Sequence, residues 1–164
     1  MSFSLIAAVG QNNELGKKGD LVFHIPGDLK YFKKVTMGHP VFMGLNTWRS
    51  LPGKLPGRDH YVLTYDPADV PEGITPVTDL DAFVTEHEDS DEELFVIGGG
   101  MVYKQMLPHC NKLYLTEVHA SDPDADTFFP DFDKTKYTRT VVDKGSDNNL
   151  DYDFVLYTRK ASNA

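Results

Sequence analysis

The stretch Val96-Ile97-Gly98-Gly99-Gly100-Met101-Val102-Tyr103 joins an apolar run, three consecutive glycines and a second apolar run. The first run has the composition of a buried strand, and the glycines permit a tight turn. After the turn, the sequence predicts a helix over 101–107 that ends before Pro108. A strand, a turn and a helix in this order form the building unit of an α/β fold.

Apolar segments of strand length recur along the whole chain. Several are nearly continuous in apolar residues, which is typical of central strands covered on both faces. Short helical patterns separate them, so the sequence predicts an α/β sandwich with a mostly parallel central sheet and an antiparallel C-terminal strand. The predicted strands are 3–9, 41–43, 61–64, 94–97, 113–118 and 154–158, with less regular segments at 74–77 and 138–142.

Two further helices are indicated by the spacing of apolar residues. One follows Asp28, where apolar side chains recur at intervals of three over 29–35. The other begins after Asp79, whose carboxylate suits an N-cap. It leads into an acidic run at 86–93, which we interpret as a solvated helix end and loop.

The length and charge of the chain limit its function. Its 164 residues are expected to form one domain over 1–164. A net charge of −9 argues against nucleic-acid binding and against anionic membranes. Residues 1–58 carry eight Lys/Arg and three Asp/Glu, a net of +5, whereas residues 59–164 carry a net of −14. Acidic residues that solubilise the surface explain the −14, but the local +5 favours an anionic ligand in the N-terminal third.

The chain has the features of a cytoplasmic protein. A lone cysteine, Cys110, cannot form an internal disulfide and fits a reducing compartment, where we expect a packed, inert thiol. No apolar run approaches the roughly 20 residues that span a bilayer, and residues 1–6 lack the basic start of a secretory signal. The six histidines show no metal-binding spacing, so no metal site is expected.

Asp28 stands at the predicted start of a helix, in Ile25-Pro26-Gly27-Asp28-Leu29. A carboxylate there complements the helix dipole, which is a purely structural role. Its neighbours Leu29 and Phe32 are expected on the same apolar face, so Asp28 could instead point into an apolar cleft. A carboxylate in such a cleft requires a hydrogen-bonded or cationic partner, as binding sites provide.

Two strand-to-helix junctions could bind phosphate. At Gly98–Gly100 the glycines let a backbone approach closely, and the helix N-terminus favours negative charge. The stretch does not match G-x-G-x-x-G because Tyr103 takes the last position, and it could be only a tight turn. The second junction, 42–48, could bind the other end of a dinucleotide. Loops 10–24 and 98–100 are expected at the carboxyl ends of the strands, where ligands bind in such sheets.

The segment 51–58 is a loop stiffened by two prolines, and it ends in Arg58. A stiff loop suits the presentation of a guanidinium for bidentate capture of a carboxylate. The alternative is a solvated arginine with no ligand.

Together these segments resemble dihydrofolate reductase over nearly the whole chain. Each motif is weak alone, but their order and spacing are specific. They are Leu5-Ile6-Ala7-Ala8, Leu15-Gly16, Ile25-Pro26-x-Asp28-Leu29-x-x-Phe32-Lys33, Met43-Gly44-x-x-Thr47-Trp48-x-Ser50, Leu55-Pro56-Gly57-Arg58, Ile97-Gly98-Gly99-Gly100-x-x-Tyr103, Leu113-Tyr114-Leu115-Thr116 and Asp126-Thr127-x-Phe129-Pro130.

The resemblance implies a three-layer sandwich and a role for each matching residue. Asp28 would pair with the pterin, assisted by Thr116, while Arg58 would clamp the glutamate α-carboxylate of folate and Asp126 would tether the mobile loop at 16–18. The Gly98–Gly99 peptide is expected to be cis. The remaining substrate residues are Ile6, Ala8, Leu29, Phe32, Ser50, Leu51 and Ile97; NADPH would contact Ala7, Leu15, Gly16, Gly44, Leu45, Asn46, Thr47, Thr64, Tyr65, Gly98, Gly99, Gly100, Met101, Val102 and Tyr103.

The implied activity is the NADPH-dependent reduction of 7,8-dihydrofolate, in a monomer that antifolates inhibit. Hydride would reach C6 and a proton would reach N5, and a nearby carboxylate would stabilise the developing cation. Asp28 would lie at the far side of the ring, so a water admitted past the mobile loop near Leu21 is the expected donor. Phe23 stands where many members have a tryptophan that would order such a water.

Two other departures concern the 2′-phosphate of NADPH. Leu45 replaces a usual arginine, and Met101 replaces a usual arginine or glutamine. Thr64, Tyr65 or a nearby histidine would remain to contact the phosphate. We therefore expect weaker discrimination between NADPH and NADH than in typical members.

Two other functions stay open at this point. One is a pyrimidine reductase of riboflavin synthesis, which shares the fold but gives no reason to combine Asp28, Thr116 and Arg58. The other is a protein that only sequesters folates or antifolates.

Overall fold

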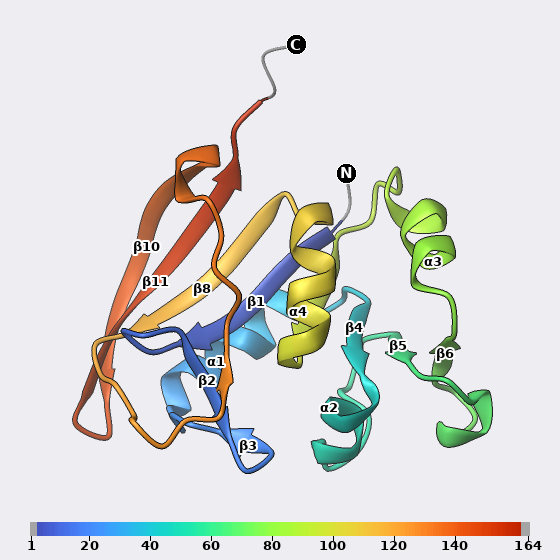
Figure 1. Cartoon of the computed structure of the whole chain (residues 1–164), viewed down its shortest axis with the longest axis horizontal. Coiled ribbons are helices and arrows are strands. Elements are labelled where there is room, and N and C mark those ends of the chain that lie inside the picture. The colour runs from blue at the N-terminus through green and yellow to red at the C-terminus, as the bar shows by residue number, and fades with distance from the viewer. Residues whose placement is uncertain (1–2, 162–164) are drawn as a thin grey trace.

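The computed structural model describes residues 3–161, which form a central eight-stranded sheet between two layers of helices (Figure 1). The strand order is β10-β11-β8-β1-β7-β4-β5-β6. The strands from β8 to β6 are parallel to one another, whereas β11 is antiparallel to both β8 and β10. The predicted fold class is therefore confirmed. The strand bounds are β1 Phe3–Val9, β4 Val41–Gly44, β5 His60–Leu63, β6 Thr75–Val77, β7 Leu94–Gly98, β8 Lys112–Val118, β10 Tyr137–Asp147 and β11 Leu150–Arg159.

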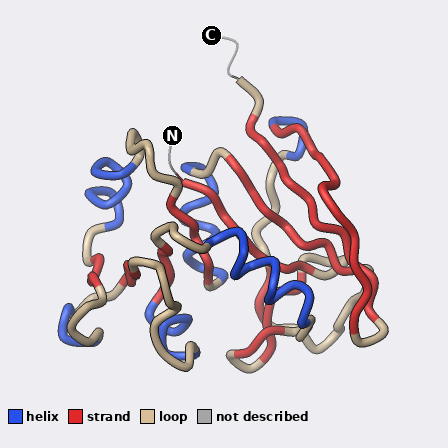
Figure 2. Tube along the Cα trace, turned by 180° about the vertical axis from the view of Figure 1, so that it is seen from behind, coloured by secondary structure: helices blue, strands red, loops and turns tan. Residues whose placement is uncertain are grey.

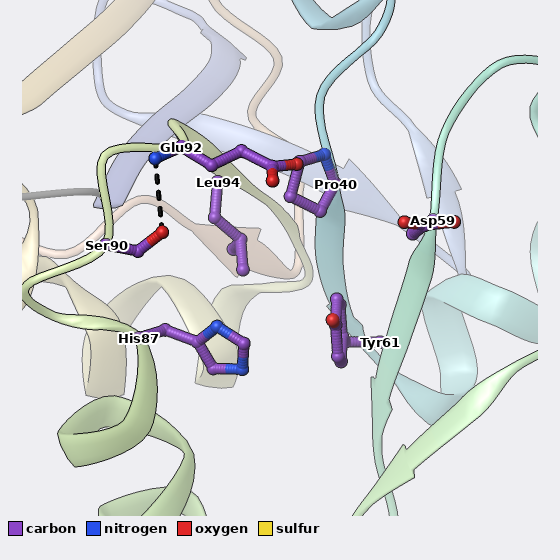
Figure 3. A pocket seen from close by; sticks show the side chains of 7 residues that line it. All are labelled: Pro40, Asp59, Tyr61, His87, Ser90, Glu92 and Leu94. Carbon is purple, nitrogen blue, oxygen red and sulfur yellow. Dashed lines mark hydrogen bonds between the residues drawn. The ribbon is translucent and has the colours of Figure 1, made fainter.

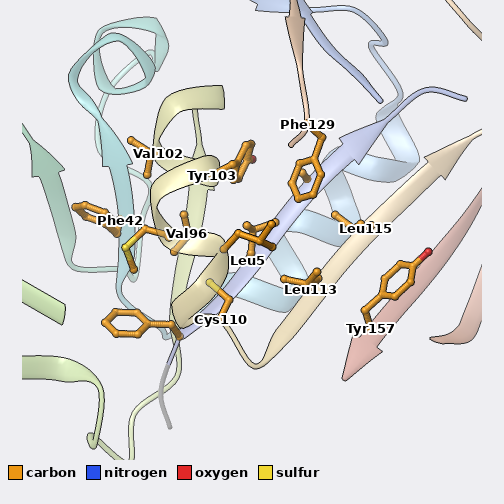
Figure 4. Close-up of a cluster of buried hydrophobic side chains, with 14 of the residues drawn as sticks. Leu5, Phe42, Val96, Val102, Tyr103, Cys110, Leu113, Leu115, Phe129 and Tyr157 are labelled. Atoms are coloured by element: carbon orange, nitrogen blue, oxygen red, sulfur yellow. The ribbon is translucent and has the colours of Figure 1, made fainter. Parts of the chain in front are cut away.

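Four α-helices cover the two faces of this sheet: α1 Pro26–Thr36, α2 Leu45–Ser50, α3 Leu80–His87 and α4 Gly100–Met106. Side chains of β1 alternate between the faces, as strand geometry requires. Leu5 packs with α3 and α4 in one apolar cluster, labelled in part in Figure 4. Ile6 packs in a second cluster with side chains of α1 and α2. Figure 2 shows α1 crossing the strands on the face away from α4.

The ends of the helices follow the expected chemistry, with small shifts. The Asp79 carboxylate accepts a hydrogen bond from the N–H of Ala82, which makes it the predicted N-cap of α3. Helix α4 begins one residue early, at Gly100, and the 3-10 turn Leu107–His109 replaces its predicted last residue. The acidic run is not wholly solvated, because Glu93 accepts hydrogen bonds from the hydroxyls of Ser4 and Tyr114.

Three short strands form a second sheet that the sequence did not predict, in the order β3-β2-β9. The segment expected to be a plain loop, 10–24, contains β2 (Glu14–Lys17) and β3 (Asp20–Leu21), and β2 pairs with β9 (Thr127–Phe128). Strands of two to four residues are too short to show a detectable alternation of apolar and polar side chains.

The β10–β11 hairpin is also longer than predicted. Strand β10 runs well past the predicted 138–142, and β11 begins four residues before Phe154. The register of the pair shifts between Val141 and Asp143, which marks a β-bulge in the edge strand. Two further 3-10 helices span Pro67–Asp69 and Lys134–Lys136. No helix within residues 3–161 is long and apolar enough to cross a membrane.

Candidate active site

Asp28 and Thr116 meet between α1 and the sheet. Thr116 is buried on β8, between Ala8 of β1 and Phe154 of β11. Its Oγ1 donates a hydrogen bond of 2.6 Å to Asp28 Oδ1, and Asp28 Oδ2 has no protein partner within residues 3–161. Burial raises the pKa of Asp28, and the bond from Thr116 opposes part of that rise. Asp28 is half-buried.

Most of the apolar residues expected to line the substrate pocket lie on α1, β1 and β7. Ile6 is buried, whereas Ala8, Phe32 and Ile97 are half-buried. Leu29 is 54% exposed, so its side chain presents an apolar surface at the edge of the site. Tyr31, on the same helix, stacks on Phe154 with ring centroids 4.0 Å apart, and this contact fixes α1 over β11. This contact places the helix that carries Asp28, Leu29 and Phe32 against the sheet.

The glycine turn brings the two strand-to-helix junctions together. The Gly98–Gly99 peptide is cis, as expected, and Gly98 has a φ of 125°. A Cβ atom at Gly99 would lie 3.4 Å from Thr47 Oγ1, and one at Gly44 would lie 3.2 Å from Val102. The junction of β4 with α2 therefore lies directly beside the junction of β7 with α4, and small residues keep the space between them open.

Some side chains that were predicted to contact ligands make contacts within the protein instead. The buried Tyr103 hydroxyl donates a hydrogen bond of 2.7 Å to the Ile6 carbonyl and fixes α4 to β1. Ala7 is buried in the cluster under α4, and Ser50 donates to the Thr47 carbonyl at the end of α2. These side chains shape the site from within the protein.

Arg58 is a buried cation without a counter-ion. Its guanidinium donates hydrogen bonds to Thr36 Oγ1 at 2.9 Å, the Pro56 carbonyl at 2.6 Å and the Lys33 carbonyl at 3.1 Å. No carboxylate within residues 3–161 forms an ion pair with it. These bonds use one N–H on each nitrogen, so one N–H on each terminal nitrogen stays available for a carboxylate. Arg58 is therefore not the solvated arginine of the alternative interpretation.

Asp126 holds the segment 10–24 as expected. Its carboxylate accepts a hydrogen bond of 2.8 Å from the Lys18 N–H, and its own N–H donates to the Gly16 carbonyl at 3.0 Å. The hydrogen bonds from the Lys18 N–H and from the Thr127 hydroxyl lower the pKa of Asp126. Farther along the segment, Leu21 is 57% exposed, and Phe23 packs against the apolar cluster around Ile25.

The sequence matches the protein-family model described as "Dihydrofolate reductase" over residues 2–159. The chain belongs to the dihydrofolate reductase family. It is 37% identical to the dihydrofolate reductase of Bacillus subtilis strain 168, over 97% of this chain and 95% of that protein. It is 39% identical to dihydrofolate reductase HdrB of Haloferax volcanii, over 96% of this chain and 84% of that protein.

A solved structure agrees with this family. The Enterococcus faecalis dihydrofolate reductase complexed with NADP(H) and RAB-propyl superposes with a TM-score of 0.87 and 28% identity, covering 98% of this chain and 97% of that one. The chain is a dihydrofolate reductase, an oxidoreductase that uses NADPH to reduce 7,8-dihydrofolate.

In this dihydrofolate reductase, one of the residues expected to contact the 2′-phosphate, Thr64, is hydrogen-bonded to an acidic side chain. The Thr64 hydroxyl donates to Asp69 Oδ2 at 3.1 Å and to the Asp66 carbonyl at 3.3 Å. Tyr65 and Met101 are exposed, and Leu45 packs partly into the cluster of α1 and α2. The nearest cation to Asp69 is Arg49, with Nη2 3.9 Å from Oδ1. Thr64, one of the residues expected to contact the 2′-phosphate, is therefore hydrogen-bonded to a carboxylate, whereas a phosphate favours cations.

Two hollows in the reductase lie away from Asp28. A hollow of about 70 Å³ lies among Pro40, Asp59, Tyr61, His87 and Leu94, at the amino ends of β4, β5 and β7 (Figure 3). A larger one, of about 340 Å³, lies between the turn after β1 and the ends of β8 and β11. Neither contains the glycine turns.

Other reactive groups of the reductase serve the fold. Cys110 is buried, and burial raises the pKa of its thiol to about 12, which fits an inert packed residue. Within residues 3–161 no group of three or more His, Cys, Asp or Glu side chains could hold a metal ion.

Three functional neighbours were not anticipated. Thr36 orients Arg58, and His60 accepts the Leu55 N–H at Nε2 while its Nδ1 contacts the Arg58 carbonyl. Glu14 is buried at the base of the segment 10–24. Only the proximity of His60 to Arg58 along the chain could have signalled one of these roles.

Proposed function

We propose that Asp28 anchors the pterin ring of 7,8-dihydrofolate, with Thr116 as its partner. The 2.6 Å hydrogen bond between the two side chains is the observation that carries this assignment. It occupies Oδ1 and leaves Oδ2 without a protein partner within residues 3–161, so the carboxylate can accept N–H groups from the 2-amino group and N3 of the ring. Desolvation makes each of these hydrogen bonds stronger than it would be in water.

The rest of the substrate would extend from Asp28 toward Arg58. Ile6, Ala8, Leu29, Phe32, Leu51 and Ile97 would line the pocket, with Ser50 at its edge. At the far end, the two available N–H groups of Arg58 would bind the glutamate α-carboxylate in bidentate fashion. A buried guanidinium with no counter-ion gains from such a ligand, because the ligand neutralises its charge.

The residues present fit a dinucleotide along the two junctions, apart from the 2′-phosphate. Gly98–Gly100 and the N-terminus of α4 would hold phosphate groups together with Gly44, Asn46 and Thr47, where a Cβ at Gly99 would fill the space beside Thr47. Leu15 and Gly16 would cover the cofactor from the segment 10–24. Bound NADPH supplies the hydride for C6 of the pterin.

Asp28 would act on the pterin through its charge. Ionised Asp28 favours positive charge on the ring, which makes C6 a better hydride acceptor. Because Asp28 would bind the side of the ring away from N5, it would not deliver that proton itself. A water passing Leu21 and ordered near Phe23 would be the donor, within the cover that the segment 10–24 provides.

We also propose that the reductase works as a cytoplasmic monomer with a single domain over 1–164, and that antifolates compete for the Asp28 site. Strands from both ends of the chain share one sheet, which supports the single domain. The net charge of −9 supports small-molecule ligands over nucleic acid.

The assignment is tested by following loss of NADPH absorbance with dihydrofolate. Asp28→Asn should lower turnover at pH 7 by about a hundredfold or more, with partial recovery in acid, where solution protonates N5. The matched control Asp81→Asn, an exposed residue of α3, should retain turnover. Unchanged turnover of Asp28→Asn at pH 7 would refute the anchor, and turnover of a deaminated ribosyl-pyrimidine would favour the riboflavin-pathway alternative.

A further inference from the structure

Glu14 differs from every other acidic residue within 3–161, because it alone is buried. Its side chain is 1% exposed, although it belongs to the short polar strand β2. Burial of an ionised carboxylate costs several kcal/mol unless hydrogen bonds compensate it. The surroundings of Glu14 therefore indicate what holds it there.

Both oxygens of Glu14 accept backbone N–H groups from separate segments. Oε1 accepts from Asn12 at 2.7 Å, within the turn that follows β1. Oε2 accepts from Asp122 at 2.6 Å, in the connection between β8 and β9. No lysine, arginine or histidine within 3–161 forms an ion pair with this carboxylate. Glu14 thus joins two chain segments through two charge-assisted hydrogen bonds.

The Glu14 carboxylate also lies beside Phe23. A Cβ atom at Gly10 would approach Glu14 Oε1 to 2.5 Å and Phe23 Cε2 to 2.9 Å, so both side chains pack against the same backbone atom. Glu14, at the base of the segment 10–24, and Phe23, which is proposed to border the proton path, therefore both pack against Gly10.

Other hydrogen bonds near Glu14 also hold the segment 10–24, but they do not involve the Glu14 carboxylate. The Gly10 N–H donates to the Glu14 carbonyl, and the Phe129 N–H donates to the Asn13 carbonyl at 2.7 Å. At the outer end of β2, Asp126 holds Lys18. Asp126 is exposed, whereas Glu14 acts from the buried end of the same strand.

We propose that Glu14 is a positioning residue for hydride transfer, which holds the segment 10–24 against 119–129 so that Leu21 and Phe23 cover the site. This role rests on the proposed function. Because the Asp28–Thr116 anchor lies on α1 and β8, Glu14 acts on the reacting geometry and leaves the anchoring of dihydrofolate intact.

Glu14→Gln is the sharpest test, because glutamine keeps the size but brings an NH₂ group against a backbone N–H. In ¹⁵N-labelled protein, the Asn12 and Asp122 amide protons should move upfield. In single turnovers, hydride transfer should slow by about tenfold, or about 1.4 kcal/mol, while the KM for dihydrofolate changes by less than about threefold. Glu72→Gln, which removes an exposed carboxylate, should alter none of these values.

Specific outcomes overturn the role. Hydride transfer within about twofold of the parent, with the amide protons moved, would leave Glu14 a purely structural residue. Slower transfer with unmoved amide protons would place the cause elsewhere. If Glu14→Gln does not fold, Glu14→Asp, which keeps the charge but is too short to reach both N–H groups, is judged by the same criteria. If the parent chain itself fails to reduce dihydrofolate, the proposed function fails, and the amide resonances still report on the two hydrogen bonds.

Discussion

Arg58 Nε and Thr36 Oγ1 form a buried hydrogen bond of 2.9 Å that fixes the guanidinium of the 51–58 loop to the last turn of α1. The same helix carries Asp28 in its first turn. One rigid helix therefore sets the distance between the two groups proposed to hold opposite ends of folate.

Arg58→Lys should weaken binding of the glutamate part of the substrate. Lysine cannot make the hydrogen bonds that the guanidinium donates to Thr36, Pro56 and Lys33, and it cannot bind a carboxylate through two parallel N–H groups. We expect the KM for dihydrofolate to rise by about tenfold or more, with no change for a dihydropterin that lacks the glutamate. Steady-state kinetics with both substrates measure the difference. An equal effect on both substrates would contradict the assignment of Arg58.

Asp28→Asn should stabilise the fold while it removes activity. Burial raises the pKa of Asp28, so the folded protein binds its proton more tightly than the unfolded chain does. The ionised group therefore destabilises the fold at neutral pH, and this penalty disappears as the pH falls through the raised pKa. We expect the free energy of unfolding at pH 7 to increase by on the order of 1 kcal/mol, with a smaller gain near pH 4.

Urea denaturation of the parent and of Asp28→Asn, at both pH values, measures this gain. Asp81→Asn serves again as the exposed control. A loss of stability at pH 7 would show that the carboxylate contributes more to the fold through Thr116 than its burial costs.

His60 should make the loop 51–58 sensitive to acid. Burial lowers the pKa of His60, so its neutral form, which accepts the Leu55 N–H, is favoured in the folded protein. The stability due to neutral His60 is complete above the unfolded pKa of about 6.5 and is lost as the pH falls below it, toward the lower folded pKa. His60→Gln should flatten the decline in unfolding free energy between pH 7 and pH 5. The control His109→Gln should leave the slope unchanged, and equal slopes in all three proteins would rule out His60.

The cofactor preference should be modest. With Leu45 and Met101 in place of cationic side chains, and with Thr64 bonded to Asp69, we expect the kcat/KM ratio of NADPH to NADH to stay below about a thousandfold, roughly 4 kcal/mol. Leu45→Arg should raise this ratio by about tenfold. Val142→Arg, which adds the same charge on the exposed edge strand, should not. A parent ratio above a thousandfold would contradict the expectation.

The predictable parts of this molecule are those that bury apolar surface with a clear period. The strands of the main sheet, the N-cap Asp79 and the junctions at Gly44 and Gly98–Gly100 all follow from local pattern and turn chemistry. Asp28 and Arg58 were already candidates from their local sequence, whereas Thr116 came from the resemblance alone, and the structure brings Asp28 and Thr116 into contact.

What the sequence could not show depends on contacts between distant segments. Glu14 lies in a polar stretch whose pattern suggests exposure, and its burial depends on the N–H of Asp122, 108 residues away. Asp28 is half-buried, and its degree of burial depends on how α1 sits over β8, which the sequence does not give. The Thr64 hydroxyl is hydrogen-bonded to the Asp69 carboxylate, and no pattern in the neighbouring sequence indicates this contact.

The position of β1 in the middle of the sheet has a consequence for synthesis on the ribosome. Its partners are β7 and β8, so the apolar segment Phe3–Val9 has no partner strand in the sheet until β7, which ends at Gly98, has been translated. At about 5–20 residues per second, this delay is roughly 5–20 s. During that time the nascent chain exposes an aggregation-prone strand, and it is then that a chaperone would be most useful to this enzyme.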